Sequence, residues 1–128
     1  MPKLNFPSQD FPRQARLIKT DEFSSVFNFR RRISGRFLAI HYQPNQLGRP
    51  RLGMIVGKKT ARLSVDRNYI KRVVRELFRT QQAQLQSVDI VVRAQKAFSH
   101  QDYPAVKQEF SQLLAKLYRP TSAAHKVN

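Results

Sequence analysis

The amphipathic pattern of residues 64–86 constrains the fold more than any other stretch of this chain, because it predicts one long helix with two chemically different sides. At 100° per residue the apolar side chains fall into one stripe. Ser64 or Asp66 is the expected N-cap, since both residue types accept hydrogen bonds from the free N–H groups of a first helical turn. A helix with an apolar stripe must bury it, so the chain needs a sheet or further helices to cover this one. The stripe consists of Ile70, Val73, Val74 and Leu77, with Tyr69 and Phe78 at its edges.

The opposite side of the predicted helix is almost uniformly basic. Three like-charged pairs follow one another at i, i+4 spacing, and each such pair costs roughly a few tenths of a kcal/mol in an isolated helix. Glu76 is expected to pair with Arg72 across one turn. Solvated helices usually alternate the sign of their charges, so the pattern favours a polyanionic partner over a simple solvated face. The basic side carries Arg67, Asn68, Lys71, Arg72, Arg75 and Arg79, and its preference for Arg over Lys suits bidentate contact with phosphate.

The charge of the whole chain points the same way. Its 128 residues contain 24 Lys and Arg against 8 Asp and Glu, a net charge of +16 at pH 7. Such an excess opposes compaction through self-repulsion, so it is expected to serve a polyanion, with nucleic acid ahead of an anionic membrane surface. No apolar run approaches the roughly 20 residues of a membrane span, and the N-terminus carries no signal-like hydrophobic stretch. These features and the absence of cysteine favour a cytoplasmic protein with no membrane partner.

The remaining patterns predict a single α+β domain over residues 16–118. Residues 1–15 contain three prolines and no periodicity, so they are expected to form a flexible arm, and residues 119–128 a polar tail. The expected order is α-β-β-α-β-α, a sandwich of helices on a small mixed sheet of three or four strands. The first predicted elements are a short helix with Thr20 as its N-cap and a hairpin of two strands, 35–43 and 51–59. The helix 64–86 and a strand 88–94 follow. The last helix is expected to begin at Asp102 and Pro104 and to end at Pro120.

Within the basic helix, the ten residues RNYIKRVVRE (67–76) closely resemble the R-N-R-[IV]-K-R-x-x-R-E signature of the bacterial ribonuclease P protein subunit. The likeness extends to RLIKTDEFSSVF (16–27) and PRLGMIVGKKT (50–60), and in all it covers about residues 16–118. Tyr69 stands where the family usually has a second Arg, and Gly57 where Ser is more usual. The resemblance implies a ribosomal protein S5 domain 2-like fold with a left-handed βαβ crossover.

The resemblance also implies a function: the protein subunit of an endoribonuclease that removes the 5′ leader from precursor tRNA. In that family a large RNA subunit with bound Mg²⁺ performs the hydrolysis, so no residue of this chain is expected to be catalytic or to hold a metal ion tightly. The expected partners are the RNA subunit and precursor tRNA, with no obligate protein partner. A structural ribosomal RNA-binding protein of similar fold is the alternative. The residues expected to contact the RNA subunit are Arg67, Asn68, Lys71, Arg72 and Arg75, with Lys58 and Lys59 extending the same surface.

A second site is expected at the aromatic residues of the first helix. Phe23 and Phe27 share one helix face, and their spacing alone suits core packing as well as ligand contact. The resemblance implies that they line a cleft between this helix and the sheet that accepts the leader, where each stacked base would contribute about 1–3 kcal/mol. By strand alternation, Leu38 and Ile40 are expected to floor the cleft, and Phe37 and Ala39 to point towards the helices.

Signals for a self-sufficient enzyme are weak. His41, His100 and His125 are dispersed along the chain and do not show the spacing of a metal site. Ser99, His100 and Asp102 are neighbours in sequence, whereas a catalytic triad needs convergence in space and an oxyanion hole. Asp102 is better explained as the cap of the last helix.

Overall fold

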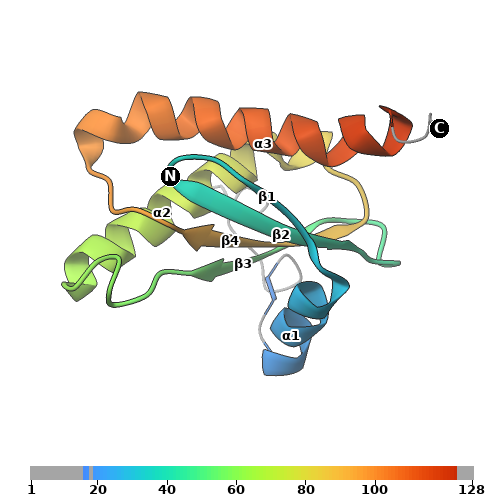
Figure 1. The fold of residues 1–128 in the computed structure, drawn as a ribbon, viewed down its shortest axis with the longest axis horizontal. Helices are drawn as coiled ribbons and strands as arrows, with labels where there is room; N and C mark the ends of the chain where they lie inside the picture. Colours follow the sequence, from blue (N-terminus) through green and yellow to red (C-terminus); the bar gives the residue numbers. More distant parts are fainter. Residues whose placement is uncertain (1–15, 18, 124–128) are drawn as a thin grey trace, which may run out of the picture.

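The computed structural model describes residues 16–17 and 19–123, with the backbone alone for residues 118–123. The predicted arm, residues 1–15, and the last residues of the predicted tail, 124–128, lie outside this range. The helices are α1 (Thr20–Phe29), α2 (Ser64–Gln81) and α3 (Tyr103–Ala123), with short 3-10 turns η3 (Gln82–Gln84) and η4 (His100–Asp102) (Figure 1). The strands are β1 (Arg31–Ser34), β2 (Leu38–Pro44), β3 (Arg51–Ile55) and β4 (Val88–Ala94).

The four strands form one mixed sheet in the order β1-β2-β4-β3, which confirms the predicted α+β class. β2 pairs antiparallel with β1 and with β4, whereas β3 and β4 are parallel. The predicted hairpin of β2 and β3 is therefore wrong, because β4 lies between them. The hairpin partner of β2 is β1, a strand that the sequence did not predict. α2 is the crossover between the parallel strands β3 and β4, and its left-handed sense stays a prediction.

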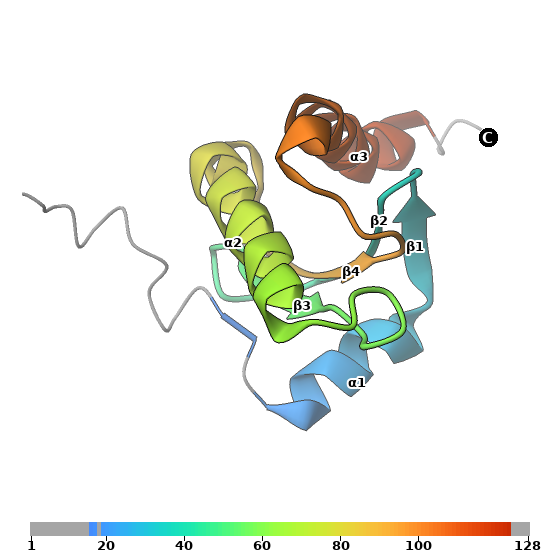
Figure 2. The same ribbon diagram turned by 90° about the vertical axis from the view of Figure 1, so that its left-hand side faces the viewer.

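The helices lie on both faces of the sheet. Figure 2 shows α2 and α3 side by side over one face, with α1 across the other. The main hydrophobic core lies under α2 and α3, as the apolar stripe of α2 requires, and a smaller cluster of Leu17, Val26 and Val91 lies under α1. The largest fully buried side chains of the main core are Phe78, Phe110, Leu38, Ile40, Leu52, Ile70, Leu77, Ile90 and Leu114.

Three predicted helix ends differ from the structure. Thr20 is the first helical residue rather than the cap; the N-cap is Lys19, whose backbone N–H donates to Glu22 Oε1 at 3.0 Å. Neither Ser64 nor Asp66 caps α2, because the N-cap position is occupied by Leu63, which provides no side-chain hydrogen bond. The last helix continues past Pro120 to Ala123, since a proline removes only one backbone donor and need not end a helix.

Glu109 of α3 holds the turn between β1 and β2. Its carboxylate accepts hydrogen bonds from the backbone N–H groups of Arg36, Phe37 and Leu38, each at 2.8 Å. Gly35 makes room for this contact, because a Cβ atom there would lie 2.5 Å from the Glu109 carboxyl carbon. The turn is thus fixed against α3, which sets the position of β1 at the edge of the sheet.

Candidate nucleic-acid interface

The basic side of α2, comprising Arg67, Asn68, Lys71, Arg72 and Arg75, is solvent-accessible along its length. Asn68 and Arg72 are exposed, and Lys71 and Arg75 are half-buried at the margin of the apolar stripe. Among the residues that the structure describes, Lys71, Arg72 and Arg75 pair with no carboxylate. The structure therefore brings the predicted helix residues together on one surface without compensating negative charge.

Glu76 does not reduce this charge in the way that the sequence suggested. Its carboxylate pairs with Arg79 rather than Arg72, with 2.6 Å between Oε2 and Nη2 and 3.2 Å between Oε1 and Nε. The hydrogen bond from Arg79 holds the pKa of Glu76 below its ordinary value, so the carboxylate stays ionised. The pairing neutralises only the end of the basic side, and the predicted Arg72 contact is wrong.

Arg67 has a contact that its RNA-binding prediction did not include. Its Nη1 donates to the carbonyl oxygens of Ala61 and Arg62, at 2.9 and 2.8 Å. Ala61 is itself buried in the main core at 5% exposure, so the guanidinium clamps the end of a loop that is already anchored. The Nε and Nη2 donors of Arg67 take no part in this clamp and can meet a further acceptor.

Lys58 and Lys59 lie on that loop, between β3 and α2, and both are exposed. A turn shapes the loop, because the N–H groups of Thr60 and Ala61 both donate to the carbonyl oxygen of Gly57 at 3.1 Å. The Arg67 clamp joins the end of this loop to the first turn of α2. The two lysines are thus held next to the N-terminal end of the basic side.

Tyr69 packs inward. It is partly buried against the main core, with its ring centroid 6.1 Å from that of Phe98 in an edge-on arrangement and 4.6 Å from that of His100. Burial raises the pKa of its hydroxyl, so it stays protonated. The residue that replaces the family's usual Arg therefore fills the space between α2 and the connection from β4 to α3, and lies beside the basic side rather than on it.

The aromatic residues of α1 lie on the sheet as predicted. The Phe27 ring meets His41 edge-on, with 4.7 Å between centroids. Phe23 lies directly on the backbone of β3, because a Cβ on Gly53 would come within 2.7 Å of its ring carbons. Both phenylalanines are partly buried against the small cluster under α1, so each combines packing with an accessible ring surface.

The predicted floor of the cleft is wrong. Leu38 and Ile40 have no exposed surface and belong to the main core on the opposite face of the sheet. Phe37, which precedes β2, does pack on the side of α2 and α3, against Phe98 at 5.9 Å between ring centroids. Alternation along β2 instead turns Ala39 and His41 towards α1. The predicted alternation of residues 38–41 was therefore correct, but the two faces of β2 were assigned to the wrong sides of the sheet.

A cavity of about 420 Å³ opens beside Phe27 on this face of the sheet. We call it the cleft. Arg32 Nη2 donates to Gln95 Oε1 at 3.2 Å across its rim. Burial, and then the charges of Arg32 and Arg93, lower the pKa of His41 below its ordinary value. The cleft is lined by Arg32, His41, Thr60, Arg93, Ala94 and Gln95.

The lining residues were missed in the sequence, although one signal was present. Arg93 is an isolated cation in the strand VDIVVRA, where its neighbours on both sides are buried. A charged residue inside an apolar strand marks a point where one face of the sheet meets solvent or a ligand. The other lining residues come from separate segments and carry no such local mark.

Two other functional features are absent from the residues that the structure describes. No group of three or more His, Cys, Asp or Glu side chains is arranged to hold a metal ion in the described part of the chain. Over the same residues, no helix has the length and apolar character that crossing a membrane requires.

The sheet, the basic helix and the cleft together define a class: a small α+β protein whose uncompensated basic surface suits a polyanion such as RNA. The family model described as Ribonuclease P matches residues 11–118. The ribonuclease P protein component of Chromobacterium violaceum is 49% identical over 109 residues, 85% of this chain and 90% of that protein. That of Ralstonia pickettii is 42% identical over 120 residues, 88% and 86% of the two chains. The solved RNase P protein from Thermotoga maritima superposes with a TM-score of 0.71 at 27% identity, covering 79% of this chain and 96% of that one.

The chain belongs to the bacterial ribonuclease P protein component family, and it is a component of the ribonuclease P ribonucleoprotein endonuclease.

Proposed function

We propose that this chain docks on the ribonuclease P RNA through the basic side of α2 and holds the single-stranded 5′ leader of precursor tRNA in the cleft. The observation that carries the proposal is the missing counter-charge: Lys71, Arg72 and Arg75 have no carboxylate partner within the described residues. RNA phosphates would supply that charge, and the release of their counterions would favour binding. Lys58 and Lys59 extend the same surface from the neighbouring loop.

The chemistry of the cleft supports the leader assignment. Sequence-tolerant binding of a single strand needs aromatic faces for the bases and cations for the backbone. Phe27 and His41 supply the first, and Arg32 and Arg93 supply the second. Phe23 holds the other end of α1 against β3 and thereby fixes the helix that carries Phe27.

In this proposal the RNA subunit and the Mg²⁺ that it holds perform the hydrolysis, as the family resemblance implies. The residues of this chain bind and orient the two RNAs. Their positive charge also lowers the repulsion between the RNA subunit and the precursor, so less Mg²⁺ is needed to bring them together. We expect this work to take place in the cytoplasm without an obligate protein partner.

A structural ribosomal RNA-binding protein is the rival function, since it would share the charge and the architecture. The family match over residues 11–118 favours ribonuclease P. Reconstitution decides between them. Addition of the purified chain to a bacterial ribonuclease P RNA at low Mg²⁺ should raise both the cleavage rate and the affinity for precursor tRNA. Cleavage and affinity no higher than with the RNA alone would contradict the proposal.

A matched pair of variants tests the docking surface. Lys71→Ala with Arg75→Ala should weaken binding to the RNA subunit and lower the slope of log K against log salt concentration by about 1.5, at roughly 0.7–0.9 per lost phosphate contact. Lys107→Ala with Lys116→Ala removes the same charge from exposed positions of α3 and should change the slope far less. Equal slopes for the two pairs would make the basic side of α2 a solvated face.

A further inference from the structure

We propose that the junction of α1 and β1, residues 28–31, is a second nucleotide-binding subsite, which takes an unpaired leader nucleotide that extends beyond the cleft. The inference rests on the proposed function, since it adds a position to the same leader. Three independent features of the junction carry it: a strained arginine, an accessible aromatic ring and a polar cavity.

Arg30 is held in a backbone conformation that ordinarily belongs to glycine. Its φ of 63° and ψ of 29° are left-handed, and among the described residues it is the one non-glycine residue with positive φ. The conformation closes α1, because the Arg30 N–H donates to the Phe27 carbonyl at 3.1 Å. Glycine would close the helix without the cost of a Cβ atom. The Arg30 side chain is exposed and contacts no partner among the described residues, so the presence of a charged side chain at this strained position needs an explanation.

Phe29 supplies an accessible aromatic surface beside this charge. Its side chain is 43% exposed and belongs to neither hydrophobic cluster. Arg31 lies near it, with the guanidinium carbon 6.0 Å from the ring centroid. An open ring beside the Arg31 guanidinium can stack on any base while the cation contacts its phosphate.

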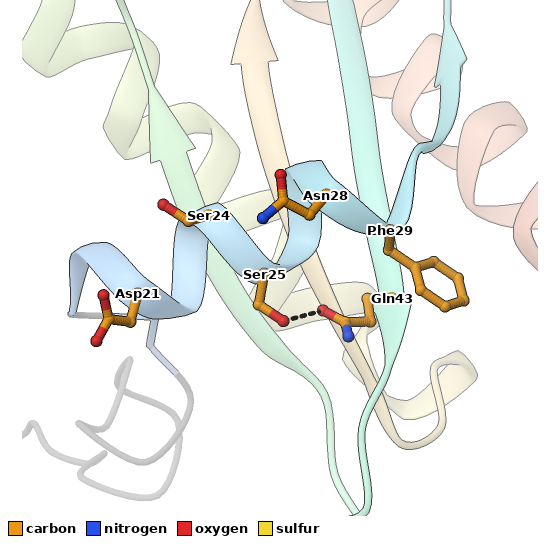
Figure 3. Close-up of a pocket in the computed structure, with 6 residues that line it drawn as sticks. All are labelled: Asp21, Ser24, Ser25, Asn28, Phe29 and Gln43. Carbon is orange, nitrogen blue, oxygen red and sulfur yellow. Dashed lines mark hydrogen bonds between the residues drawn. The ribbon is translucent and has the colours of Figure 1, made fainter.

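A cavity of about 460 Å³ runs along the outer side of α1 and ends at Phe29. Figure 3 shows Asp21 at one end of this cavity and Phe29 at the other, with Gln43 of β2 near the ring. Eight residues of helix separate the two ends by about 12 Å, so the Asp21 carboxylate does not repel a phosphate at the Phe29 end. Ser25 Oγ donates to Gln43 Oε1 at 2.9 Å, which leaves the Gln43 amide N–H₂ to donate to a base or a ribose.

The junction also adjoins the cleft. Arg32 lines the cleft, and Arg31, Arg30 and Phe29 precede it along the chain. A single strand that runs from Arg32 along β1 towards α1 therefore reaches the junction that carries Phe29, Arg30 and Arg31. Only a leader long enough to leave the cleft would make these contacts.

Leader length is the variable that tests the subsite. The reconstituted ribonucleoprotein is measured with precursors whose leaders have about four or about twelve nucleotides, a range typical of single-strand sites. Phe29→Ala should weaken the affinity for the long-leader precursor about fivefold or more, as loss of one stacked base requires, and leave the short-leader precursor unchanged. Phe29→Tyr should restore it. Leu47→Ala removes a side chain of similar exposure, 48%, from the loop between β2 and β3 and should have no effect.

Arg30→Gly separates charge from structure. The substitution relieves the left-handed strain, so the thermal midpoint should stay the same or rise, while long-leader affinity should fall. A purely structural arginine would give no loss of affinity. Unchanged long-leader affinity in both Phe29→Ala and Arg30→Gly, or equal losses for long and short leaders, would overturn the subsite.

Two further arms separate the possible failures. Binding of the RNA subunit alone should be unaffected by Phe29→Ala; a loss there would assign the junction to the RNA subunit and overturn the leader assignment. Phe27→Ala should weaken precursors with either leader more than mature tRNA, because the ring packs on His41, which lines the proposed cleft. If Phe27→Ala shows this preference and Phe29→Ala does not, the second subsite fails and the proposed function stands. If Phe27→Ala affects precursor and mature tRNA equally, the cleft assignment fails as well.

Discussion

The Arg67 guanidinium serves the fold and the proposed RNA contact at once. Its Nη1 hydrogen bonds to Ala61 and Arg62 hold the loop of Lys58 and Lys59 against a helix whose N-cap, Leu63, has no capping side chain. A lysine at this position would keep the charge but could not donate to two carbonyls and a phosphate in one plane. The charge and the geometry of Arg67 are therefore separable by substitution.

Arg67→Lys should weaken binding to the ribonuclease P RNA about tenfold or more, because a hydrogen bond from a charged group contributes about 1.5–3 kcal/mol. The salt slope should stay close to that of the wild type, since the number of cations is unchanged. Arg75→Lys, on the same side of α2 without a clamp, should change affinity about twofold or less. Affinity measured over a KCl series checks both, and equal losses for the two variants would assign the effect of Arg67→Lys to phosphate contact alone.

His41 is a titratable group in the cleft, and its protonation is expected to depend on whether RNA is bound there. Phe27 of α1, Arg32 of β1 and Arg93 of β4 surround it, and burial and the two arginines lower its pKa. A bound phosphate offsets the positive charges and raises that pKa, so binding takes up a proton. Proton uptake means tighter binding as the pH falls through the pKa of the bound state.

Leader RNA should consequently bind about threefold tighter at about pH 5.5 than at about pH 7.5, with His41 responsible for the difference. In the free protein a falling pH has the opposite, destabilising effect. The lowered pKa of His41 means that the folded state binds a proton less readily than the unfolded state, so the free energy of unfolding falls as the pH drops through about 6.5. His41→Phe keeps the aromatic contact with Phe27 and should abolish both effects, whereas His100→Asn should preserve them. A pH dependence that survives His41→Phe would contradict the assignment.

At the scale of elements, the position of α1 depends on one glycine of β3. The Phe23 ring lies where a Cβ of residue 53 would be, 2.7 Å from two ring carbons and 3.2 Å from Leu17 Cδ1. The close approach lets α1 lie flat on the sheet, with Val26 fully buried beneath it. Because Phe27 is on the same helix, any tilt of α1 at Phe23 also moves the ring that packs on His41 of the cleft.

Gly53→Ala should destabilise the fold by about 1–3 kcal/mol, the usual cost of overpacking a filled interior. Gly57→Ala is the matched control, since a Cβ there meets no atom within 4 Å. Chemical denaturation measures both free energies of unfolding. Adding Phe23→Leu should recover part of the loss in Gly53→Ala; without such recovery, the clash would not lie at the Phe23 ring.

The elements also show which parts of the fold a local pattern carries. The apolar stripe of α2 is periodic over many residues, so the helix and its buried face were predictable. β1 has only one half-buried residue, Ile33, among exposed arginines and a serine, so it left no alternation to detect. The prediction of a hairpin between β2 and β3 was wrong, because β4 lies between these two strands in the sheet even though a short loop joins them in sequence. Which face of β2 meets α1 depends on this non-local arrangement, and Leu38 and Ile40 were misplaced with it.

The same distinction applies to the two sites. The basic side of α2 lies on one helix, so its members were identified together from their spacing. The cleft is assembled from β1, β2, β4 and the loop before α2, through the antiparallel pairing of Arg32 with His41 and of Ala39 with Arg93. No local pattern gives that register, so Arg32, Thr60, Arg93 and Gln95 emerged only from the structure.

Several of the few acids of the molecule make contacts that hold the fold, whereas most of its bases face solvent. Arg51 is held between Glu22 of α1 at 2.9 Å and Asp89 of β4 at 2.8 Å, and the hydrogen bond that it donates to Asp89 is the largest cause of its raised pKa. Glu76 pairs with Arg79, and Glu109 caps the turn between β1 and β2. With 8 acids against 24 Lys and Arg in the whole chain, a net charge of +16 remains after every carboxylate is counted. The free protein is therefore expected to be strained by repulsion that RNA would relieve.

Salt should act on the free protein and on the complex in opposite directions. Raising KCl from about 0.1 M to about 1 M shortens the Debye length from roughly 10 Å to 3 Å, which screens repulsion among exposed cations. A gain of about 1 kcal/mol from this screening would raise the thermal midpoint by about 4 °C for a chain of this size. The partly buried Arg51 pairs are screened less, so their loss does not cancel the gain.

Over the same range RNA affinity should fall by orders of magnitude, because counterion release no longer favours binding. Calorimetry of the free protein and titration of the complex measure the two trends, and Lys107→Ala with Lys116→Ala, two charges fewer, should reduce the rise in midpoint. A midpoint that falls with KCl would show that internal ion pairs rather than self-repulsion dominate the electrostatics of this fold.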